Sequence, residues 1–200
     1  MIDKLLDIDG NILLWIQDNI RNDILTPIVK FITSLGNAGM IWIAITLILL
    51  IFKKTRKIGG ICALSLISSL VINNFILKNL VARVRPYDQI SALNLIIEKQ
   101  KDWSFPSGHT GSSFACAWAI FRNAPKKYGV PTLILAILIA LSRLYVGVHF
   151  PSDVLAGVVT GILSSYVGQF VFEKSRELRS LLLTLLFALG RFDDKLGAQG

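Results

Sequence analysis

Long apolar runs separated by short charged segments dominate the pattern of hydrophobic and polar positions along the chain. A helix needs roughly 20 mainly apolar residues to cross the hydrocarbon core of a bilayer. The clearest apolar runs are 38–52, 58–77, 130–148 and 154–172, and a shorter fifth run, 110–121, needs the turn before it to lie at membrane depth. The pattern therefore predicts an all-α fold, a multi-pass transmembrane helical bundle.

The segment 1–35 has a different pattern, in which charged positions interrupt the apolar ones. Ile12 and Ile16 share one helical face, whereas Asp9 and Asp18 interrupt any run that is compatible with lipid. Such a pattern is typical of amphipathic helices that lie along a membrane interface, and its slight acidic excess favours the outer interface. A tilted first span is the alternative, so the total is expected to be five or six spans.

The C-terminal part of the chain is expected to lie on the cytoplasmic face. The run 181–189 is apolar but too short to cross a bilayer alone, which favours a helix at the interface. We therefore predict a single membrane-embedded domain over 1–200, in which the N-terminal segment is followed by a helical core over 38–172 and a cytoplasmic tail over 173–200.

The composition supports a membrane location. Of the 200 residues 53% are hydrophobic, and the mean hydropathy of +0.60 is well above that of water-soluble domains. The net charge of +8 does not indicate nucleic-acid binding, because the basic residues sit mostly in short loops beside the predicted spans. Cys62 and Cys116 fall inside apolar runs without metal-ligand spacing, so they read as small buried hydrophobes rather than a disulfide or a zinc site.

Lysine and arginine in the loops predict the orientation, because cytoplasmic loops of membrane proteins carry them in excess. The basic loop 53–57 is therefore expected to be cytoplasmic, as are Arg122 and the basic residues after the last span. Alternation of the spans then puts the loop 78–105 and the turn 149–153 together on the opposite, outer face. The polar clusters in these two segments, described next, are thus expected on the same side of the membrane.

The first polar cluster follows the predicted span 58–77. Lys78 and Arg85 are seven residues apart, a spacing that puts two side chains on one helical face, and Pro86 is expected to end that helix. Two cations on one face can hold a dianionic phosphate, Arg85 as a planar fork and Lys78 as a point charge. Basic side chains that merely extend from an interface toward water are an equally good interpretation of this segment alone.

The second cluster, 104–109, opens the short run 110–121. Pro106 suits the first turn of a helix and Gly108 lets the backbone approach a ligand closely. The free N–H groups of a helix N-terminus attract anions. His109 would stand beside such an anion, where an imidazole can protonate a leaving oxygen at neutral pH. An ordinary helix cap with a histidine at the interface is the alternative.

The third cluster runs from Ser142 to Asp153. His149 and Asp153 are four residues apart, a spacing that brings side chains together on a helix, and Pro151 suits a helix start. Asp153 can then hold one imidazole N–H and leave the other nitrogen free to attack phosphorus. Arg143 lies late in an apolar run, where a guanidinium needs an anionic partner. A structural salt bridge between Arg143 and Asp153 is the alternative to a phosphate contact.

Together these residues resemble the three-part signature of the type 2 phosphatidic acid phosphatase superfamily. The signature is written Lys-x6-Arg-Pro, Pro-Ser-Gly-His and Ser-Arg-x5-His-x3-Asp, and the resemblance covers roughly 39–172. Every position is matched, by Lys78, Arg85, Pro86, Pro106, Ser107, Gly108, His109, Ser142, Arg143, His149 and Asp153. The resemblance implies a helical fold, and the membrane-bound members of the family usually have five or six spans.

The resemblance also implies a mechanism. His149 would attack phosphorus and form a phosphohistidine, Asp153 would orient His149, and His109 would protonate the leaving lipid oxygen. The implied phosphate-binding groups are Lys78, Arg85, Arg143, Ser107 and the Gly108 amide. No metal or other cofactor is implied, because the fixed cations supply positive charge and the outer carboxylates, among them Asp102, lack the pattern of a divalent-ion site.

The expected substrate is a membrane lipid phosphate or diphosphate, cleaved on the extracellular or periplasmic side of the cell membrane. An outward-facing site suits undecaprenyl diphosphate, a carrier lipid of cell-wall synthesis. Phosphatidylglycerol phosphate, phosphatidic acid and lipid A 1-phosphate are alternatives with the same reactive group. The loop 87–103 brings apolar side chains such as Leu93, Leu95 and Ile96 near the predicted mouth, where they either help to select the lipid or only pack on the interface.

Two other classes of protein compete with the lipid phosphatase. The family resemblance extends to soluble vanadium-dependent haloperoxidases, against which the apolar runs argue. A transporter or channel with a basic binding site would explain buried cations, but not why histidine, aspartate and the cations fall at the spacing of a hydrolase.

Overall fold

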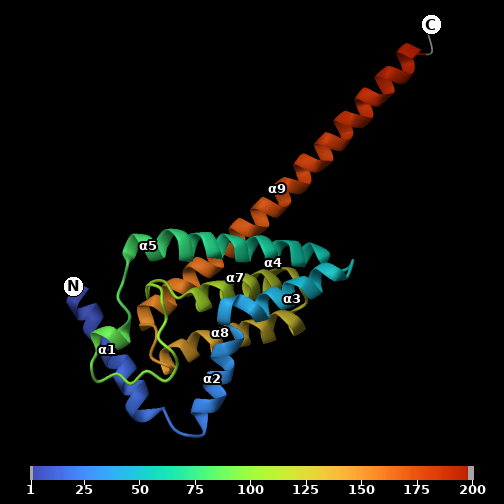
Figure 1. Cartoon of the computed structure of the whole chain (residues 1–200). Coiled ribbons are helices and arrows are strands. Elements are labelled where there is room, and N and C mark those ends of the chain that lie inside the picture. The colour runs from blue at the N-terminus through green and yellow to red at the C-terminus, as the bar shows by residue number, and fades with distance from the viewer. Residues whose placement is uncertain (1, 198–200) are drawn as a thin grey trace.

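The computed structural model describes the main chain of residues 2–197 and the side chains of residues 6–178. Within this part every regular element is helical (Figure 1), so the predicted all-α class is confirmed. The α-helices are α1 (Ile2–Asn19), α2 (Leu25–Leu35), α3 (Met40–Ile51), α4 (Arg56–Ser69), α5 (Lys78–Val81), α6 (Pro86–Gln89), α7 (Gly108–Asn123), α8 (Lys126–Tyr145) and α9 (Pro151–Gly197). A 3-10 turn (Asn37–Gly39) precedes α3, and a π-helical segment (Leu70–Leu77) joins α4 to α5.

Helix α7 forms the centre of the bundle, and α4, α8 and α9 pack around it. Ala115 and Cys116 of α7 are fully buried, as is Cys62 of α4, and both cysteines are free thiols, as predicted. Helix α9 approaches α7 closely, since a Cβ atom on Gly161 would lie only 2.6 Å from the carbonyl oxygen of Gly111. Small residues thus let the two helices that carry the second and third polar clusters pack side by side.

Among the described residues, three helical segments are long and apolar enough to cross a membrane: Arg56–Gln89, Lys126–Tyr145 and Pro151–Leu178. The pair formed by Leu25–Leu35 and Asn37–Ile51 is bent by 49° and adds a fourth crossing if it counts as one span. The central helix α7 has only 16 residues. A multi-pass helical fold is therefore supported, whereas the predicted total of five or six spans is not confirmed.

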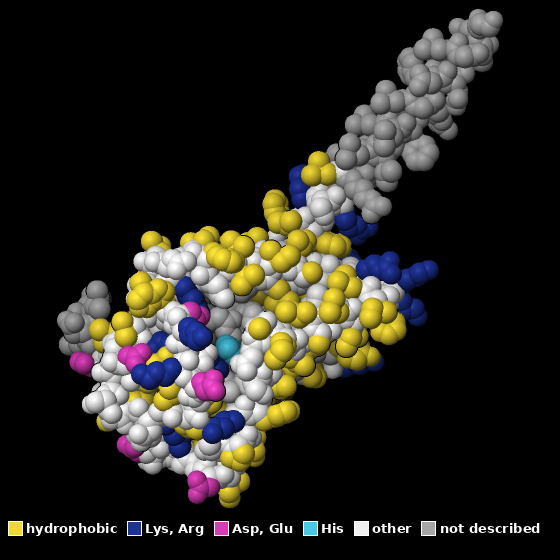
Figure 2. Space-filling view, in the orientation of Figure 1, with side chains coloured by type: hydrophobic (Ala, Val, Ile, Leu, Met, Phe, Trp, Pro, Cys, Tyr) yellow, Lys and Arg dark blue, Asp and Glu magenta, His cyan; other side chains and the backbone are white. Residues whose placement is uncertain are grey.

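Hydrophobic side chains cover much of the outer surface of the bundle (Figure 2). Ile48 in α3, Leu141 in α8 and Phe170 in α9 are 53%, 54% and 68% exposed. Apolar patches of this extent are rare on water-soluble proteins. The surface therefore fits contact with the hydrocarbon of a bilayer.

The helix that leads to the first polar cluster ends earlier than its sequence predicts. Helix α5 stops at Val81 because Ala82 adopts a left-handed conformation with φ of 47°. Arg85 is extended, as the residue before a proline usually is, and Pro86 begins α6 instead of ending a helix. The prediction that Lys78 and Arg85 lie on one helical face is therefore wrong, although the two side chains still meet.

Helices α1 and α2 lie at the end of the bundle where α9 begins (Figure 1). Helix α1 packs on α8 and α9, and α2 packs on α8. Asp9 and Leu13 of α1 are buried, whereas Ile8 and Trp15 are 56% and 58% exposed. The outward face of α1 thus carries large apolar side chains beside polar ones, and Asp9 points into the protein. The interfacial position of this segment stays a prediction.

The segment between α6 and α7 has no regular secondary structure. Leu93 is only 5% exposed and belongs to the main hydrophobic core. Leu95 and Ile96 pack against Val146 and Val148, in the turn after α8. These apolar side chains thus pack within the protein, and a part in selecting the lipid stays a prediction.

Helix α9 continues without a break to Gly197 and extends beyond the bundle (Figure 1). The apolar run 181–189 belongs to this helix, and its side chains lie outside the described residues. Its predicted position at an interface and the cytoplasmic location of 173–200 stay predictions.

Candidate active site

The histidine and aspartate of the third cluster face each other at the junction between α8 and α9. His149 precedes Pro151, the first residue of α9, and Asp153 lies in the first turn of that helix. His149 Nδ1 is 3.6 Å from Asp153 Oδ2, and both side chains are buried. Burial lowers the pKa of His149 to about 3 against the opposing effect of Asp153. The imidazole is therefore neutral at neutral pH.

Three further groups hold the carboxylate of Asp153. Its Oδ2 atom accepts hydrogen bonds from Ser104 Oγ at 2.5 Å and from the Phe150 N–H at 2.9 Å. Its Oδ1 atom accepts from Arg83 Nη1 at 2.7 Å. The orientation of the carboxylate beside His149 is therefore fixed from several sides. Neither Ser104 nor Arg83 has a role predicted from the sequence.

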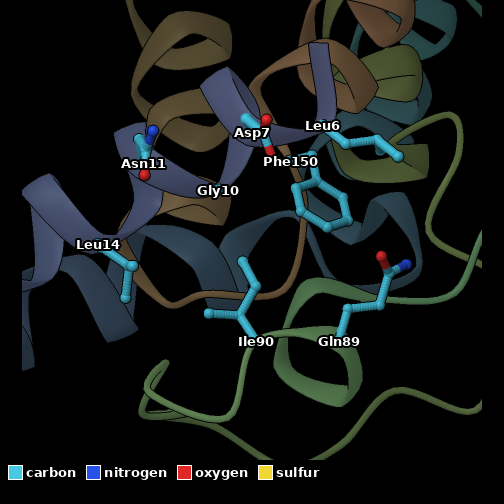
Figure 3. Close-up of a pocket in the computed structure, with 8 residues that line it drawn as sticks. All are labelled: Leu6, Asp7, Gly10, Asn11, Leu14, Gln89, Ile90 and Phe150. Carbon is cyan, nitrogen blue, oxygen red and sulfur yellow. The ribbon is translucent and has the colours of Figure 1, made fainter. Parts of the chain in front are cut away.

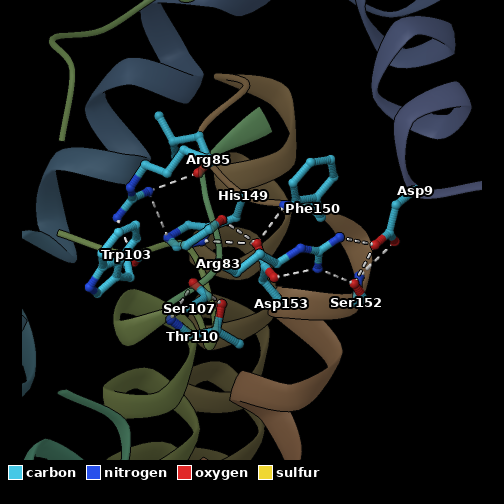
Figure 4. A network of polar contacts seen from close by, with 12 residues as sticks. Asp9, Arg83, Arg85, Trp103, Ser107, Thr110, His149, Phe150, Ser152 and Asp153 are labelled. Carbon is cyan, nitrogen blue, oxygen red and sulfur yellow. Dashed lines mark hydrogen bonds and ion pairs between the residues drawn. The ribbon is translucent and has the colours of Figure 1, made fainter. Parts of the chain in front are cut away.

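Arg83 connects Asp153 to the N-terminal helix α1 (Figure 4). Its Nη2 atom donates to Asp9 Oδ2 at 2.8 Å, and the guanidinium lies 3.9 Å from the centroid of the Phe150 ring. Asp9 also accepts from the Ser152 N–H at 3.0 Å. In the sequence Asp9 stands out only because it interrupts an apolar helical face. Asp9 and Arg83 are 74 residues apart, so no local spacing could predict their contact.

Arg85 stands beside the nitrogen of His149 that faces away from Asp153. Its Nη1 atom lies 3.4 Å from His149 Nε2 and donates to the carbonyl oxygen of Val148 at 2.7 Å. Its Nε atom donates to the carbonyl oxygen of Asp102 at 2.8 Å. Main-chain oxygens from two segments thus fix a buried guanidinium next to a neutral imidazole.

Lys78 and Arg85 share the carboxylate of Asp102. Lys78 forms an ion pair with Asp102 Oδ2, and Arg85 Nη2 lies 2.6 Å from Asp102 Oδ1. Burial alone would raise the pKa of Asp102, but the bonds to Lys78 and Arg85 hold it at about 2. Asp102 is therefore ionised at neutral pH. The sequence predicts no role for Asp102, because it lacks the pattern of a divalent-ion site.

Arg143 is 1% exposed near the C-terminal end of α8. Its Nη1 atom donates to Thr33 Oγ1 in α2 at 2.6 Å, whereas its Nε atom has no hydrogen-bond partner among the described residues. Asp153 pairs with Arg83, and the described side chains include no ion pair between Arg143 and Asp153. The structural salt bridge that the sequence left open is thus not formed.

The second cluster forms the N-terminus of α7. Ser107 caps the helix, which begins at Gly108, and the Ser107 N–H donates to the carbonyl oxygen of Asp153 at 3.1 Å. His109 Nε2 lies 3.0 Å from Asn37 Oδ1 in the 3-10 turn. The N-terminus of α7 is therefore tied to α9, and its histidine to the bend between α2 and α3. Asn37 had no role predicted from the sequence.

One cavity of about 660 Å³ gathers most of these side chains. Its polar part is lined by Lys78, Arg85, Asp102, Gly108, His109, Arg143 and His149. Its apolar part is lined by residues of α3, α4 and the π-helical segment, namely Ile43, Leu47, Leu50, Ala63, Leu66, Ile67 and Leu70. Ser107 and Asp153 adjoin the polar part through the contacts described above. The candidate residues of three separate sequence clusters thus meet at one place.

A smaller cavity of about 220 Å³ lies between α1 and α6 (Figure 3). Leu6, Leu14, Ile90 and Phe150 form most of its apolar wall, and Asp7 also lines it. It contains none of the candidate residues.

The described residues include no group of three His, Cys, Asp or Glu side chains that could hold a metal ion. The positive charge of the large cavity comes from Lys78, Arg85 and Arg143. Independence from metal stays a prediction.

The comparison with protein families identifies the chain. A sequence model of the PAP2 superfamily matches residues 58–176, a range that contains every candidate site residue. The chain belongs to the PAP2 superfamily. The resemblance found in the sequence is therefore confirmed. This PAP2 chain is 35% identical to the undecaprenyl-diphosphatase of Sulfolobus acidocaldarius over 143 residues, which cover 72% of the chain and 68% of that protein.

Two solved structures are similar to this PAP2 protein. LpxE from Aquifex aeolicus superimposes with a TM-score of 0.69 and 28% identity, covering 78% of this chain and 92% of that one. A transmembrane PAP2 type phosphatidylglycerolphosphate phosphatase from Bacillus subtilis gives a TM-score of 0.69 and 26% identity, covering 86% and 87%. The transmembrane relative supports a membrane location, and the relatives' names support a hydrolase of lipid phosphates as the enzyme class.

Proposed function

We propose that this PAP2 protein removes phosphate from a membrane lipid phosphate or diphosphate through a phosphohistidine intermediate. The proposal rests on the single cavity of about 660 Å³, in which two histidines and three cations line the polar part. The apolar part beside them, lined by α3, α4 and the π-helical segment, is called the channel below. Such a cavity suits a substrate with a charged head and a hydrocarbon tail. A soluble haloperoxidase would have no use for the channel or for the apolar outer surface.

His149 is the proposed nucleophile. Its Nδ1 atom faces Asp153, which favours the tautomer with the proton on Nδ1 and leaves a lone pair on Nε2. Because burial keeps the ring neutral, that lone pair is available at neutral pH. Nε2 attacks phosphorus, and Arg85, 3.4 Å away, binds a phosphoryl oxygen as the new N–P bond forms. Asp153 stabilises the imidazolium that results.

His109 is the proposed general acid. The Asn37 oxygen 3.0 Å from its Nε2 atom is an acceptor and favours a proton on that nitrogen. In the substrate complex the phosphate dianion favours the doubly protonated ring. The proton on Nδ1 passes to the lipid oxygen as the P–O bond breaks, so the lipid leaves as a neutral alcohol or a protonated phosphate and His109 is left neutral. The neutral ring then accepts a proton from the water that hydrolyses the phosphohistidine.

The cations are proposed to bind the phosphoryl oxygens and to stabilise their charge in the transition state. Arg143 offers an Nε donor without a protein partner among the described residues, and Lys78 offers an ammonium at the cavity wall. Ser107 and the Gly108 amide, at the N-terminus of α7, supply neutral donors.

Undecaprenyl diphosphate is the proposed substrate. The relative from Sulfolobus acidocaldarius is named for that lipid, and the apolar channel suits an isoprenoid chain. Phosphatidylglycerol phosphate, phosphatidic acid and lipid A 1-phosphate are the alternatives. The similar Bacillus subtilis structure is that of a phosphatidylglycerolphosphate phosphatase, which favours the first of them.

The site is proposed to face the outer side of the membrane. The exposed basic loop 53–57 lies at the start of α4, and Lys78 follows the π-helical extension of the same helix. The basic loop and the site are thus at opposite ends of one span, and a cytoplasmic basic loop requires an outward site. Five crossings result if the bent pair of α2 and α3 counts as one span and the short helix α7 crosses within the bundle.

Phosphate release from a panel of purified lipids in detergent, without added metal, tests the proposed function. The account predicts the highest kcat/KM for undecaprenyl diphosphate and inhibition by vanadate, a mimic of five-coordinate phosphorus. Release from none of the lipids would contradict a phosphatase. Uptake of an anion into proteoliposomes without hydrolysis would favour the transporter instead.

A further inference from the structure

One carboxylate of the cavity has no part in the proposed mechanism. Asp102 belongs to the irregular segment between α6 and α7 and lines the cavity beside both histidines. Its side chain is 52% exposed, whereas those of its partners Lys78 and Arg85 are 7% and 4% exposed. An accessible anion thus covers two buried cations.

The two oxygens of this carboxylate occupy the donors that a phosphoryl group needs. One pairs with Lys78 and the other accepts from Arg85 Nη2 at 2.6 Å. The other donors of Arg85 are directed to main-chain oxygens: Nε to Asp102 and Nη1 to Val148. Nη2 is therefore the donor of Arg85 that an incoming anion can reach by replacing a side chain. A carboxylate and a phosphoryl group present similar paired oxygens to these donors.

We propose that Asp102 is an internal competitor for the phosphate-binding subsite, occupying Lys78 and Arg85 when the site is empty and leaving them when a phosphoryl group binds. The proposal rests on the proposed function, in which these two cations hold the substrate phosphate. Asp102 thereby lowers the affinity of the site for an oxyanion, including the phosphate released after hydrolysis.

Electrostatics favour an exchange over joint occupancy. Lys78, Arg85 and Arg143 carry like charge around one cavity, and buried cations without a counter-ion are costly. The carboxylate offsets that cost in the empty site. When a phosphate dianion arrives, a retained carboxylate would face a like charge at close range, which disfavours binding.

The backbone allows the side chain to leave without disturbing the site. The carbonyl oxygen of Asp102 remains bound to Arg85 Nε at 2.8 Å, so rotation of the side chain alone releases both cations. Half of the side chain already faces solvent. The movement therefore needs no rearrangement of a helix.

Orthophosphate binding to the purified full chain in detergent, measured by calorimetry, tests the proposal. Asp102→Asn removes the charge and keeps the size of the side chain. It should bind orthophosphate at least about tenfold more tightly than the wild type, because a like charge beside the anion is lost. Asp88→Asn is the matched control: Asp88 is an exposed carboxylate paired with Lys99 at 2.7 Å and does not line the cavity. It should bind like the wild type.

Equal or weaker binding by Asp102→Asn would overturn the proposal, because Asp102 would then merely position the cations. Binding by none of the proteins would overturn it as well. If Asp102→Asn does not fold, Asp102→Ser also removes the charge. It should likewise bind orthophosphate more tightly than the wild type. Calorimetry does not depend on hydrolysis. A chain that binds orthophosphate more tightly after neutralisation of Asp102, but cleaves no lipid, would keep this inference and reject the proposed function.

Discussion

At the residue scale, the chemistry of the cavity depends on which hydrogen-bond donors face a bound phosphoryl group. Arg85 illustrates this, because it satisfies three donors with Asp102 and Val148 and still lies 3.4 Å from His149 Nε2. A guanidinium can make all of these contacts at once because its donors point in fixed directions. An ammonium carries the same charge on one atom and cannot.

Arg85→Lys is therefore expected to lower kcat/KM by about 100-fold or more, the usual cost of losing a donor to a transition-state oxyanion. Phosphate release in detergent measures the loss. Arg122→Lys makes the same change in the last turn of α7, at the far end of that helix from His109, and should leave kcat/KM near the wild-type value. Wild-type activity in Arg85→Lys would argue against a phosphoryl contact by this residue.

At the scale of elements, the N-terminal helix α1 is part of the site. Asp9 is 3% exposed and joins α1 to Arg83, which in turn holds Asp153 at 2.7 Å. A helix that reads as a peripheral amphipathic segment thus supports the carboxylate beside the proposed nucleophile.

Asp9→Asn is expected to lower the free energy of unfolding by about 2 kcal/mol, because the partly buried Arg83 loses a charged hydrogen-bond partner. Thermal unfolding in detergent measures the change. Asp18→Asn, at an exposed position of the same helix, should have no measurable effect. Equal stability of the two variants would show that Asp9 does not anchor α1.

The channel formed by α3, α4 and the π-helical segment should distinguish a lipid from a soluble phosphate. Ala63 of α4 lines it, so Ala63→Trp should fill it and raise KM for a long-chain lipid by about tenfold or more, a loss comparable to a few methylene groups of burial. A short-chain soluble phosphate should be cleaved as before. Ile48→Trp on the exposed face of α3 is the control. Equal effects on both substrates would place the lipid chain elsewhere.

Sequence and structure agree where local spacing determines geometry. The helix start at Pro151 follows from the sequence, as does the approach of His149 to Asp153, because both depend on neighbours within one turn. Contacts between distant segments could not be predicted. Asn37 and His109 are 72 residues apart, and Thr33 and Arg143 are 110 apart. Hydrophobic periodicity indicates which face of a helix is buried, but not which helix covers it.

At the scale of the whole molecule, the proposed orientation rests on the basic residues at one end of the bundle. Lys101 is exposed in the irregular segment beside the site, and Lys53 is exposed in the basic loop at the other end of the span that begins with α4. Both native cysteines are buried, so an introduced cysteine should dominate labelling.

A membrane-impermeant maleimide applied to intact cells should therefore label Lys101→Cys and not Lys53→Cys. Permeabilised cells should give label at both positions, which controls for reactivity. Labelling of Lys53→Cys alone from outside would reverse the proposed orientation and put the site on the cytoplasmic face.

The convergence of two histidines and three cations on one phosphoryl group is the central claim, and the covalent intermediate tests it most directly. Mass spectrometry of protein quenched at alkaline pH during turnover should find a phosphoryl group on His149. His149→Ala should insert into the membrane normally, carry no phosphoryl group and release no phosphate. Turnover by His149→Ala, or a phosphoryl group on another residue while His149 stays unmodified, would contradict the account.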